Sequence, residues 1–288
     1  MQHQHNTMQE DQGTFMGIGG EGIHYHCWLP EGDVKAVLII VHGLAEHAGR
    51  YGYLVNYFIS SGYAVYAIDH IGHGRSSGRR AFVESFDQFV ETLKTFRDMV
   101  ARWQTGKPLF MVGHSMGGLI GCQYLIEHPH DFAGAILSAP AMQLPDSISP
   151  VTEILGKVLS SILPRVGLKK LDAEGISRNS HIVEEYEKDS LVYHGRVSAR
   201  LSVEIHRAME GVLARAESIK TPILILQGGD DRMVAPEGAQ LLYDKAGASD
   251  KSLKLYDGLY HEIFNEPERE TVFKNVEEWL EKRLSTHH

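Results

Sequence analysis

The sequence predicts an α/β fold in which helices cover both faces of a mostly parallel central sheet, with a helical cap inserted before the sheet is complete. First, short apolar runs of strand length alternate with longer runs whose apolar residues follow helical spacing. Second, a strand-like run meets a helix-like run across the sequence Gly-His-Ser-Met-Gly at residues 113–117. Third, the alternation stops between residues 140 and 214 and then resumes.

Length and composition favour one large domain with an insertion. The chain has 288 residues, 43% of them hydrophobic, which is enough for one sizeable core. We expect residues 1–140 to form the first part of the core, with a flexible tail over residues 1–15. Residues 141–214 are expected to form the helical cap, and residues 215–288 the second part of the core.

Charge and cysteine content limit the partners and the location. A formal net charge of -9 without a long basic block excludes a general nucleic-acid binder. Two isolated cysteines, Cys27 and Cys122, are too few for a disulfide framework or a metal site, which favours a reducing compartment. No apolar run has the length of a signal peptide or of a membrane span. We expect a soluble, cytoplasmic protein, with peripheral association with a membrane or lipid surface left open.

Each element follows from its apolar pattern. Short continuous apolar runs predict buried strands. The predicted strands are residues 23–29, 35–41, 63–68, 109–112, 134–139, 221–227 and 252–256. Apolar residues at helical spacing predict amphipathic helices. The predicted helices are residues 50–60, 84–103, 117–127, 236–246 and 268–284. Between residues 140 and 214 the pattern contains short helical pieces and no convincing strand.

Ser115 lies at the turn between the predicted strand 109–112 and the predicted helix 117–127. In a Gly-x-Ser-x-Gly elbow only glycine tolerates the close backbone approach on either side, and the turn exposes the serine hydroxyl at the edge of the sheet. A structural turn with an incidental serine is the alternative. It is disfavoured because the strand and the helix that the motif requires are both present. Ser115 is therefore the candidate nucleophile.

The loop that follows the predicted strand 35–41 begins with His42 and Gly43. In folds built around a serine elbow, a loop in this place supplies the second backbone donor of an oxyanion hole. Leu44 is the candidate for this donor. An ordinary strand-to-helix loop explains the same residues equally well, so the sequence leaves both interpretations open.

A serine nucleophile needs a base, and the base needs a carboxylate that orients it. In folds with a serine elbow the acid and then the histidine follow the serine along the chain. Asp230 and Asp231 both follow the predicted strand 221–227 and compete for the role of the acid. His261 is the only histidine after Asp231 outside the terminal tail, so it is the candidate base.

Motifs along most of the chain can be compared with known families. They are His-Gly-Leu-Ala-Glu-His at 42–47, Gly-Arg-Tyr at 49–51, Asp-His-Ile-Gly-His-Gly-Arg-Ser at 69–76, Gly-His-Ser-Met-Gly-Gly at 113–118, Ser-Arg-Asn at 177–179, Gln-Gly-Gly-Asp-Asp at 227–231 and Tyr-His at 260–261. Together they resemble the monoacylglycerol lipase family of α/β-hydrolases, whose lysophospholipase members share much of the pattern. The resemblance implies an α/β-hydrolase fold with Ser115 as nucleophile, Asp231 rather than Asp230 as acid, and His261 as base.

The resemblance also implies roles for residues around the triad. The backbone N–H groups of Leu44 and Met116 would form the oxyanion hole. Glu46 and Arg50 match positions near the polar end of the family's pocket and would help to hold a glycerol head group. A structural ion pair is the alternative for either of these two residues.

An apolar stripe at helical spacing runs from Val151 to Leu163 in the predicted cap. Within it, Ile154, Leu155 and Val158 are candidates for contact with the substrate. The stripe is expected to line a substrate tunnel, to face lipid, or to be buried on the main domain. The sequence leaves these three alternatives open.

These observations together predict a serine hydrolase that cleaves acyl esters through an acyl-enzyme. The resemblance implies monoacylglycerol as the substrate, which would be converted to fatty acid and glycerol. Lysophospholipase or broad carboxylesterase activity remains an alternative. A non-catalytic ligand-binding protein of the same fold is disfavoured, because candidates for all three triad members occur in the required order. No metal or cofactor is expected. The expected partner is an acylglycerol or another lipid ester, with transient contact of the cap with a lipid surface left open and no nucleic acid.

Overall fold

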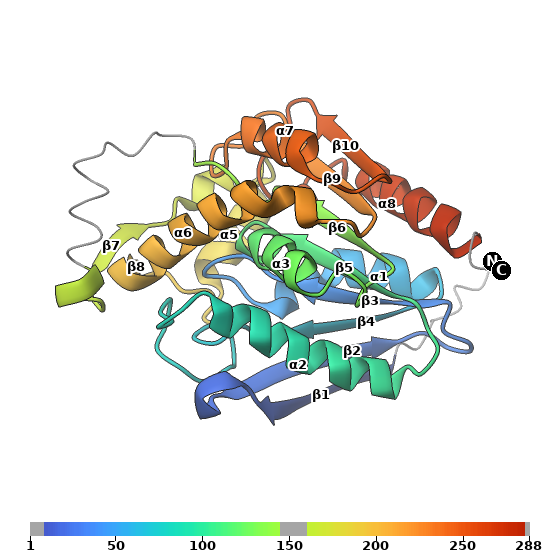
Figure 1. Cartoon of the computed structure of the whole chain (residues 1–288), viewed down its shortest axis with the longest axis horizontal. Coiled ribbons are helices and arrows are strands. Elements are labelled where there is room, and N and C mark those ends of the chain that lie inside the picture. Colours follow the sequence, from blue (N-terminus) through green and yellow to red (C-terminus); the bar gives the residue numbers. More distant parts are fainter. Residues whose placement is uncertain (1–8, 145–159, 286–288) are drawn as a thin grey trace.

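An eight-stranded sheet forms the centre of the computed structural model, which describes residues 9–144 and 160–285. The strands lie in the order β1-β2-β4-β3-β5-β6-β9-β10 (Figure 1). Their bounds are β1 Gln9–Met16, β2 Gly22–Leu29, β3 Ala36–Val41, β4 Tyr63–Ile68, β5 Leu109–His114, β6 Gly134–Ser138, β9 Ile223–Gly228 and β10 Lys251–Tyr256. β2 is antiparallel to β1 and β4, and the other neighbours pair in parallel. The predicted mostly parallel sheet is confirmed.

Helices cover both faces of this sheet, as predicted. Their bounds are α1 Gly52–Ser60, α2 Asp87–Trp103, α3 Met116–Glu127, α5 Ser180–Lys188, α6 Ala199–Arg215, α7 Pro236–Lys245 and α8 Arg269–Leu284. Short 3₁₀ helices cover Ile18–Gly20, Ala48–Tyr51, Ala173–Gly175 and Ala216–Ser218. α1 and α8 pack on one face of the sheet, and α2, α3, α6 and α7 pack on the other (Figure 1).

β3 shows why a central strand of this fold has no polar side. Val37 and Ile39 join the apolar cluster on the side of α2 and α3, whereas Leu38 and Ile40 join the cluster on the side of α1 and α8. All four side chains are fully buried. Successive side chains point to opposite faces of a sheet, so a strand covered on both faces must be apolar at every position.

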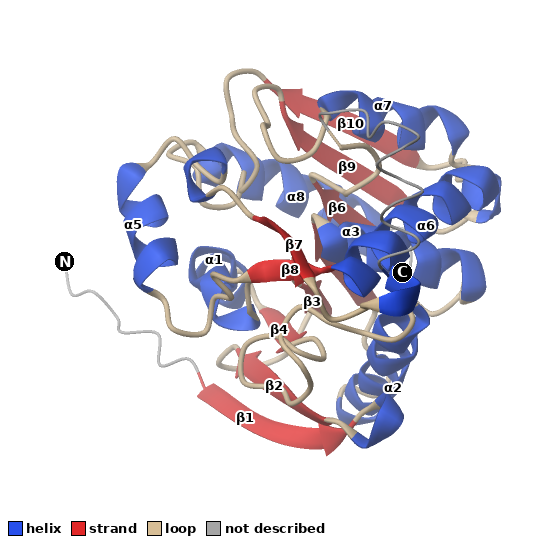
Figure 2. Cartoon of the chain, turned by 90° about the vertical axis from the view of Figure 1, so that its left-hand side faces the viewer, coloured by secondary structure: helices blue, strands red, loops and turns tan. Residues whose placement is uncertain are grey.

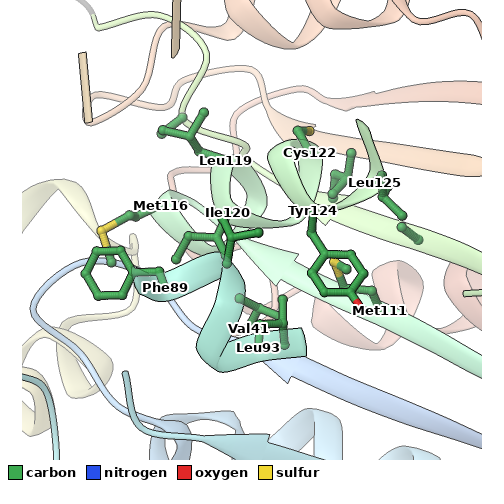
Figure 3. Close-up of a cluster of buried hydrophobic side chains, with 14 of the residues drawn as sticks. Val41, Phe89, Leu93, Met111, Met116, Leu119, Ile120, Cys122, Tyr124 and Leu125 are labelled. Carbon is green, nitrogen blue, oxygen red and sulfur yellow. The ribbon is translucent and has the colours of Figure 1, made fainter. Parts of the chain in front are cut away.

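The helix that follows the elbow is anchored by apolar packing. Figure 3 shows Met116 of α3 beside Phe89 of α2, in a cluster that also contains Ile120 and Cys122 of α3 and Leu93 of α2. Each of these side chains is almost completely buried. Full burial of a large apolar side chain contributes about 1.5–3 kcal/mol of transfer free energy, so the N-terminus of α3 is firmly held. Cys122 is a small, fully buried residue of this cluster.

The N-terminal segment differs from the sequence prediction. A flexible tail is predicted over residues 1–15, whereas β1 begins at Gln9 and pairs with β2 from Gln9 to Met16. Most side chains of β1 are exposed because it is an edge strand, so its sequence carries little apolar signal. Phe15 is an exception: its ring stacks on that of Phe96 in α2, with the ring centroids 5.8 Å apart.

Between β6 and β9 the chain leaves the sheet. β7 (Gly167–Lys170) and β8 (Arg196–Ser198) pair with each other as a separate two-stranded sheet (Figure 2), so the prediction of no strand in this stretch is wrong. Strands of four and three residues are too short to show a hydrophobic period. α6 lies in the same segment, yet it packs on the core beside α3. The division of the chain at residues 141 and 214 stays a prediction.

Candidate active site

The predicted strand-turn-helix elbow is present around Ser115. β5 ends directly before this residue and α3 begins directly after it, and Ser115 has φ 53° and ψ -119°, a strained backbone for a residue with a side chain. A Cβ atom on Gly117 would overlap the carbonyl oxygen of Val41, and one on Gly113 would lie 2.7 Å from the carbonyl oxygen of Gly117. The close approach of neighbouring backbone therefore requires both glycines of the motif.

The loop after β9 separates the two competing carboxylates. Asp231 is buried, whereas Asp230 is exposed. Oδ1 of Asp231 accepts hydrogen bonds from the backbone N–H groups of Met233 at 2.8 Å and Val234 at 3.0 Å. Oδ2 accepts a hydrogen bond from Nε2 of Gln227 at 2.9 Å. The structure thus fixes Asp231, and not Asp230, in the interior.

His261 follows β10 and is paired with Asp231. Nδ1 of the imidazole lies 2.7 Å from Oδ2 of the carboxylate. Burial lowers the pKa of His261, but the charge and the hydrogen bond of Asp231 outweigh burial and raise it above its usual value. Burial raises the pKa of Asp231, but the charge and the hydrogen bond of His261 lower it overall. The pairing holds the Nδ1 proton toward Asp231 and leaves Nε2 as the nitrogen that can exchange a proton.

Five of the predicted site residues line one cavity of about 100 Å³: Leu44, Glu46, Ser115, Met116 and His261. Met116 is the first residue of α3, where backbone N–H groups have no partner inside the helix. Most of the remaining lining is apolar, contributed by Ala141, Leu144, Leu171, Ile176, Ile205, Met233 and Val234. A larger depression of about 650 Å³ between α1 and α5 contains none of these five residues, although Arg50 lines it. The arrangement can bring an apolar acyl group to a serine beside a histidine.

Glu46 and Arg50 belong to a buried charged cluster next to this cavity. Glu46 lines the cavity, and its carboxylate accepts hydrogen bonds from the Gly43 N–H at 2.5 Å and from the Tyr51 hydroxyl at 2.7 Å. Arg50 pairs with Glu46 at 3.4 Å and with both carboxylate oxygens of Glu262. Arg50 is not among the described residues that line the cavity. The ion pair that the sequence left as an alternative is present, and contact of these residues with substrate stays a prediction.

Sequence reasoning missed two residues that adjoin His261. The ring centroids of His114 and His261 are 4.7 Å apart. Burial, together with the charge of His261, lowers the pKa of His114 to about 3, so His114 stays neutral and does not compete as a base. Glu262 is a buried carboxylate that lines the same cavity. Their adjacency in sequence to Ser115 and His261 is the signal that could have found them.

The predicted contacts in the cap cannot be placed, because Ile154, Leu155 and Val158 lie outside the described residues. The described end of the apolar stripe, Ile162 and Leu163, is 71% and 52% exposed. Within residues 9–144 and 160–285, no helix is long and apolar enough to cross a bilayer. In the same ranges, no group of histidine, cysteine and carboxylate side chains is arranged to hold a metal ion.

Comparison with known proteins shows which proteins this chain resembles. The profile of a family described as serine aminopeptidase, S33 matches residues 32–268. The chain is 37% identical to the monoacylglycerol lipase of Mycolicibacterium smegmatis, covering 94% of this chain and 97% of that protein. It is 34% identical to the monoglyceride lipase of Homo sapiens, covering 93% and 90%. The crystal structure of Paleococcus ferrophilus monoacylglycerol lipase superposes with a TM-score of 0.80 at 32% identity, covering 96% and 99%.

The sheet order, the serine elbow and this structural neighbour define the protein as an α/β-hydrolase. The chain belongs to the monoacylglycerol lipase family of α/β-hydrolases, within the group described as serine aminopeptidase, S33. It is an enzyme of the carboxylic ester hydrolase class, as the sequence predicted.

Proposed function

We propose that this enzyme hydrolyses monoacylglycerol to a fatty acid and glycerol, with Ser115, Asp231 and His261 as its catalytic triad. The observation that carries the proposal is that a strained serine and an aspartate-paired histidine line the same largely apolar cavity. The names of the relatives from Mycolicibacterium smegmatis and Homo sapiens support monoacylglycerol as the substrate.

The first step is acylation of the serine. As Oγ of Ser115 attacks the ester carbonyl, Nε2 of His261 accepts its proton, and Asp231 stabilises the imidazolium through Nδ1. The carbonyl oxygen becomes an oxyanion that accepts hydrogen bonds from the backbone N–H groups of Leu44 and Met116. Each such donor contributes about 2.7–4 kcal/mol to stabilisation of the transition state.

The remaining steps release the two products. His261 passes its proton to the glycerol oxygen as the bond between that oxygen and the acyl carbon breaks, which leaves the acyl group on Ser115. Water then attacks the acyl-enzyme while His261 accepts a proton from it. Collapse of the second oxyanion releases the fatty acid, and the proton on His261 returns to Oγ of Ser115.

The lining of the cavity supports an acyl ester as substrate. Each CH₂ group of an acyl chain that leaves water contributes about 0.8 kcal/mol, so apolar side chains such as Ile205 and Met233 favour a lipid chain. The carboxylate of Glu46 at the polar end of the cavity can accept a hydrogen bond from a glycerol hydroxyl. Ile162 and Leu163 are exposed apolar residues of the cap segment, and we place them at the surface that meets lipid aggregates.

Covalent labelling tests the nucleophile. A fluorophosphonate probe should label the parent, and Ser115→Ala should abolish both labelling and turnover while circular dichroism shows an unchanged fold. Ser60→Ala on α1 is the matched control, because Ser60 is exposed and its hydroxyl only caps the carbonyl of Tyr57. Because triad members act as a unit, His261→Ala should lower turnover about 10⁶-fold. Labelling that persists in Ser115→Ala would refute the assignment.

A substrate panel tests the ester class. The ratio kcat/KM should be highest for a monoacylglycerol when it is compared with a lysophosphatidylcholine and a p-nitrophenyl ester of the same acyl chain. A preference for lysophosphatidylcholine would assign the enzyme as a lysophospholipase. Equal values for all three would indicate a broad carboxylesterase.

A further inference from the structure

Arg50 joins two loops that are far apart in the sequence. Its guanidinium donates two hydrogen bonds to the carboxylate of Glu262, one of them at 2.9 Å, and Nη1 also donates to Oε2 of Glu46 at 3.4 Å. The side chains of Arg50, Glu46 and Glu262 are only 7%, 6% and 7% exposed. A planar guanidinium that binds a carboxylate with two parallel bonds fixes orientation as well as distance.

Each carboxylate in turn holds a loop of the site. Oε1 of Glu46 accepts a hydrogen bond from the N–H of Gly43, and Gly43 directly precedes Leu44, whose N–H is the proposed oxyanion donor. Glu262 directly follows the proposed base, and its Oε2 accepts a hydrogen bond from Nδ2 of Asn265 at 2.8 Å. The cluster therefore connects the loop after β3, which carries the oxyanion donor, with the loop after β10, which carries the base.

The same cluster also contacts the segment between β6 and β9. The guanidinium of Arg50 lies 4.7 Å from the centre of the ring of Tyr186 in α5. The backbone N–H of Glu262 donates to the carbonyl oxygen of Ile176 at 2.7 Å. Burying charged groups costs several kcal/mol per ion, and buried ion pairs often give no net stability, so stability alone is a poor explanation for this cluster.

We propose, on the basis of the function proposed above, that the Arg50–Glu262 ion pair is a positioning clamp that holds His261 at a fixed place relative to the oxyanion donor of Leu44. Arg50 directs its donors to the two carboxylates; it lines the neighbouring depression between α1 and α5, but it is not among the described residues that line the cavity with Ser115 and His261. Its effect on the reaction is therefore exerted through the two loops and not through contact with glycerol.

A clamp and a glycerol contact have different kinetic consequences. The acyl-enzyme no longer contains the alcohol, so loss of a glycerol contact leaves deacylation and reaction with a fluorophosphonate unchanged. Loss of the clamp misplaces the base and the oxyanion donor, which serve acylation, deacylation and phosphonylation alike. A displacement of about 1 Å within such a site lowers the rate by up to about 100-fold.

Two substitutions weaken the clamp without removing its bulk. Arg50→Lys keeps the charge but loses the fork that binds Glu262 with two bonds, and Glu262→Gln keeps the shape and one acceptor. Arg97→Lys is the matched control, because Arg97 is also a largely buried arginine, 18% exposed, that donates two hydrogen bonds to the carbonyl of Asp131 away from the cavity.

The experiment is stopped-flow hydrolysis of p-nitrophenyl octanoate, steady-state hydrolysis of 1-octanoylglycerol, and fluorophosphonate inactivation, with all rates referred to the folded fraction. In Arg50→Lys and Glu262→Gln we expect the acylation, deacylation and inactivation rates to fall together, by up to about 100-fold, with little change in KM. We expect Arg97→Lys to match the parent.

Three results would overturn the clamp. Impaired hydrolysis of 1-octanoylglycerol with parental deacylation and inactivation would make Arg50 a glycerol contact. A lower melting temperature with parental rates would make the pair merely structural, and parental behaviour in every assay would leave it without a role. If the parent itself neither reacts with the fluorophosphonate nor cleaves either ester, the function proposed above fails instead.

Discussion

Replacement of Asp231 by Asn is a sharp test of the site, because the structure predicts how the new side chain is oriented. Oδ1 of Asp231 accepts hydrogen bonds from two backbone N–H groups, so the asparagine must place its carbonyl oxygen at this position. Its NH₂ group then occupies the place of Oδ2 and faces Nδ1 of His261. His261 must accept a hydrogen bond at Nδ1 and carry its proton on Nε2, which is the wrong tautomer for a base acting on Ser115.

The loss should be large in activity and small in stability. A base held in the wrong tautomer lowers turnover by about 10⁴-fold in a Ser-His-Asp site. Loss of the charged acceptor should lower the free energy of unfolding by about 1–3 kcal/mol. The loss stays in this range because Oε1 of Gln227, buried and without a hydrogen-bond partner among the described residues, can turn toward the new amide.

Asp230→Asn is the matched control, since it removes the same charge one residue away on an exposed side chain. Turnover of p-nitrophenyl octanoate and the rate of fluorophosphonate inactivation should fall in Asp231→Asn and remain at the parental level in Asp230→Asn. Urea unfolding of both variants separates catalysis from stability. Equal losses in the two variants, or a larger loss in Asp230→Asn, would refute the assignment of Asp231.

The neutral imidazole of His261 is the base and its pKa is raised above 6.5, so kcat/KM should rise with pH through a midpoint above 6.5; a pH-rate profile with a lower midpoint would contradict this. In urea unfolding, Gly117→Ala should lower the free energy of unfolding by at least about 1–3 kcal/mol, because the added Cβ atom overlaps the backbone of Val41. The control is Gly211→Ala in α6, where the added Cβ atom meets open space. This substitution should raise the free energy of unfolding by about 0.5–1 kcal/mol. Glutamate at Ile162 and Leu163 should slow hydrolysis of long-chain monoacylglycerol aggregates more than that of p-nitrophenyl butyrate, and equal slowing would argue against a lipid-facing role.

The sequence predicted the six inner strands of the sheet well because burial on both faces leaves an unmistakable apolar pattern, and it also predicted the edge strand β10. β3 and β4 are apolar at all six positions, and the predicted and observed bounds differ by at most a residue. β1 escaped prediction because an edge strand exposes most of its side chains, as the polar run from Gln9 shows. β7 and β8 escaped it because each is specified by pairing with the other and not by a pattern of its own.

The elbow was predictable because its requirements are local. A Cβ atom at position 113 or 117 would overlap nearby backbone, so both positions require glycine. This requirement is visible in the sequence as a fixed spacing of two glycines around Ser115. The choice between Asp230 and Asp231 was not local. It depends on which side chain turns inward to meet the N–H groups of Met233 and Val234, and the residues alone carry no sign of that direction.

The same distinction explains why the Arg50–Glu262 pair could not be predicted. The carboxyl ends of parallel strands meet at one edge of a sheet, so the order of strands already predicts that the loops after β3, β5, β9 and β10 converge. Which side chains then meet depends on loop conformations such as the positive φ of 66° at Ala45, which lies beside Glu46. Loops that converge do not make a catalytic site unless the distances between their catalytic groups are fixed, because a displacement of about 1 Å lowers the reaction rate by up to about 100-fold. A buried ion pair between two of these loops supplies such a distance, and a search for paired charges across converging loops is therefore a rational way to find positioning residues in relatives of this fold.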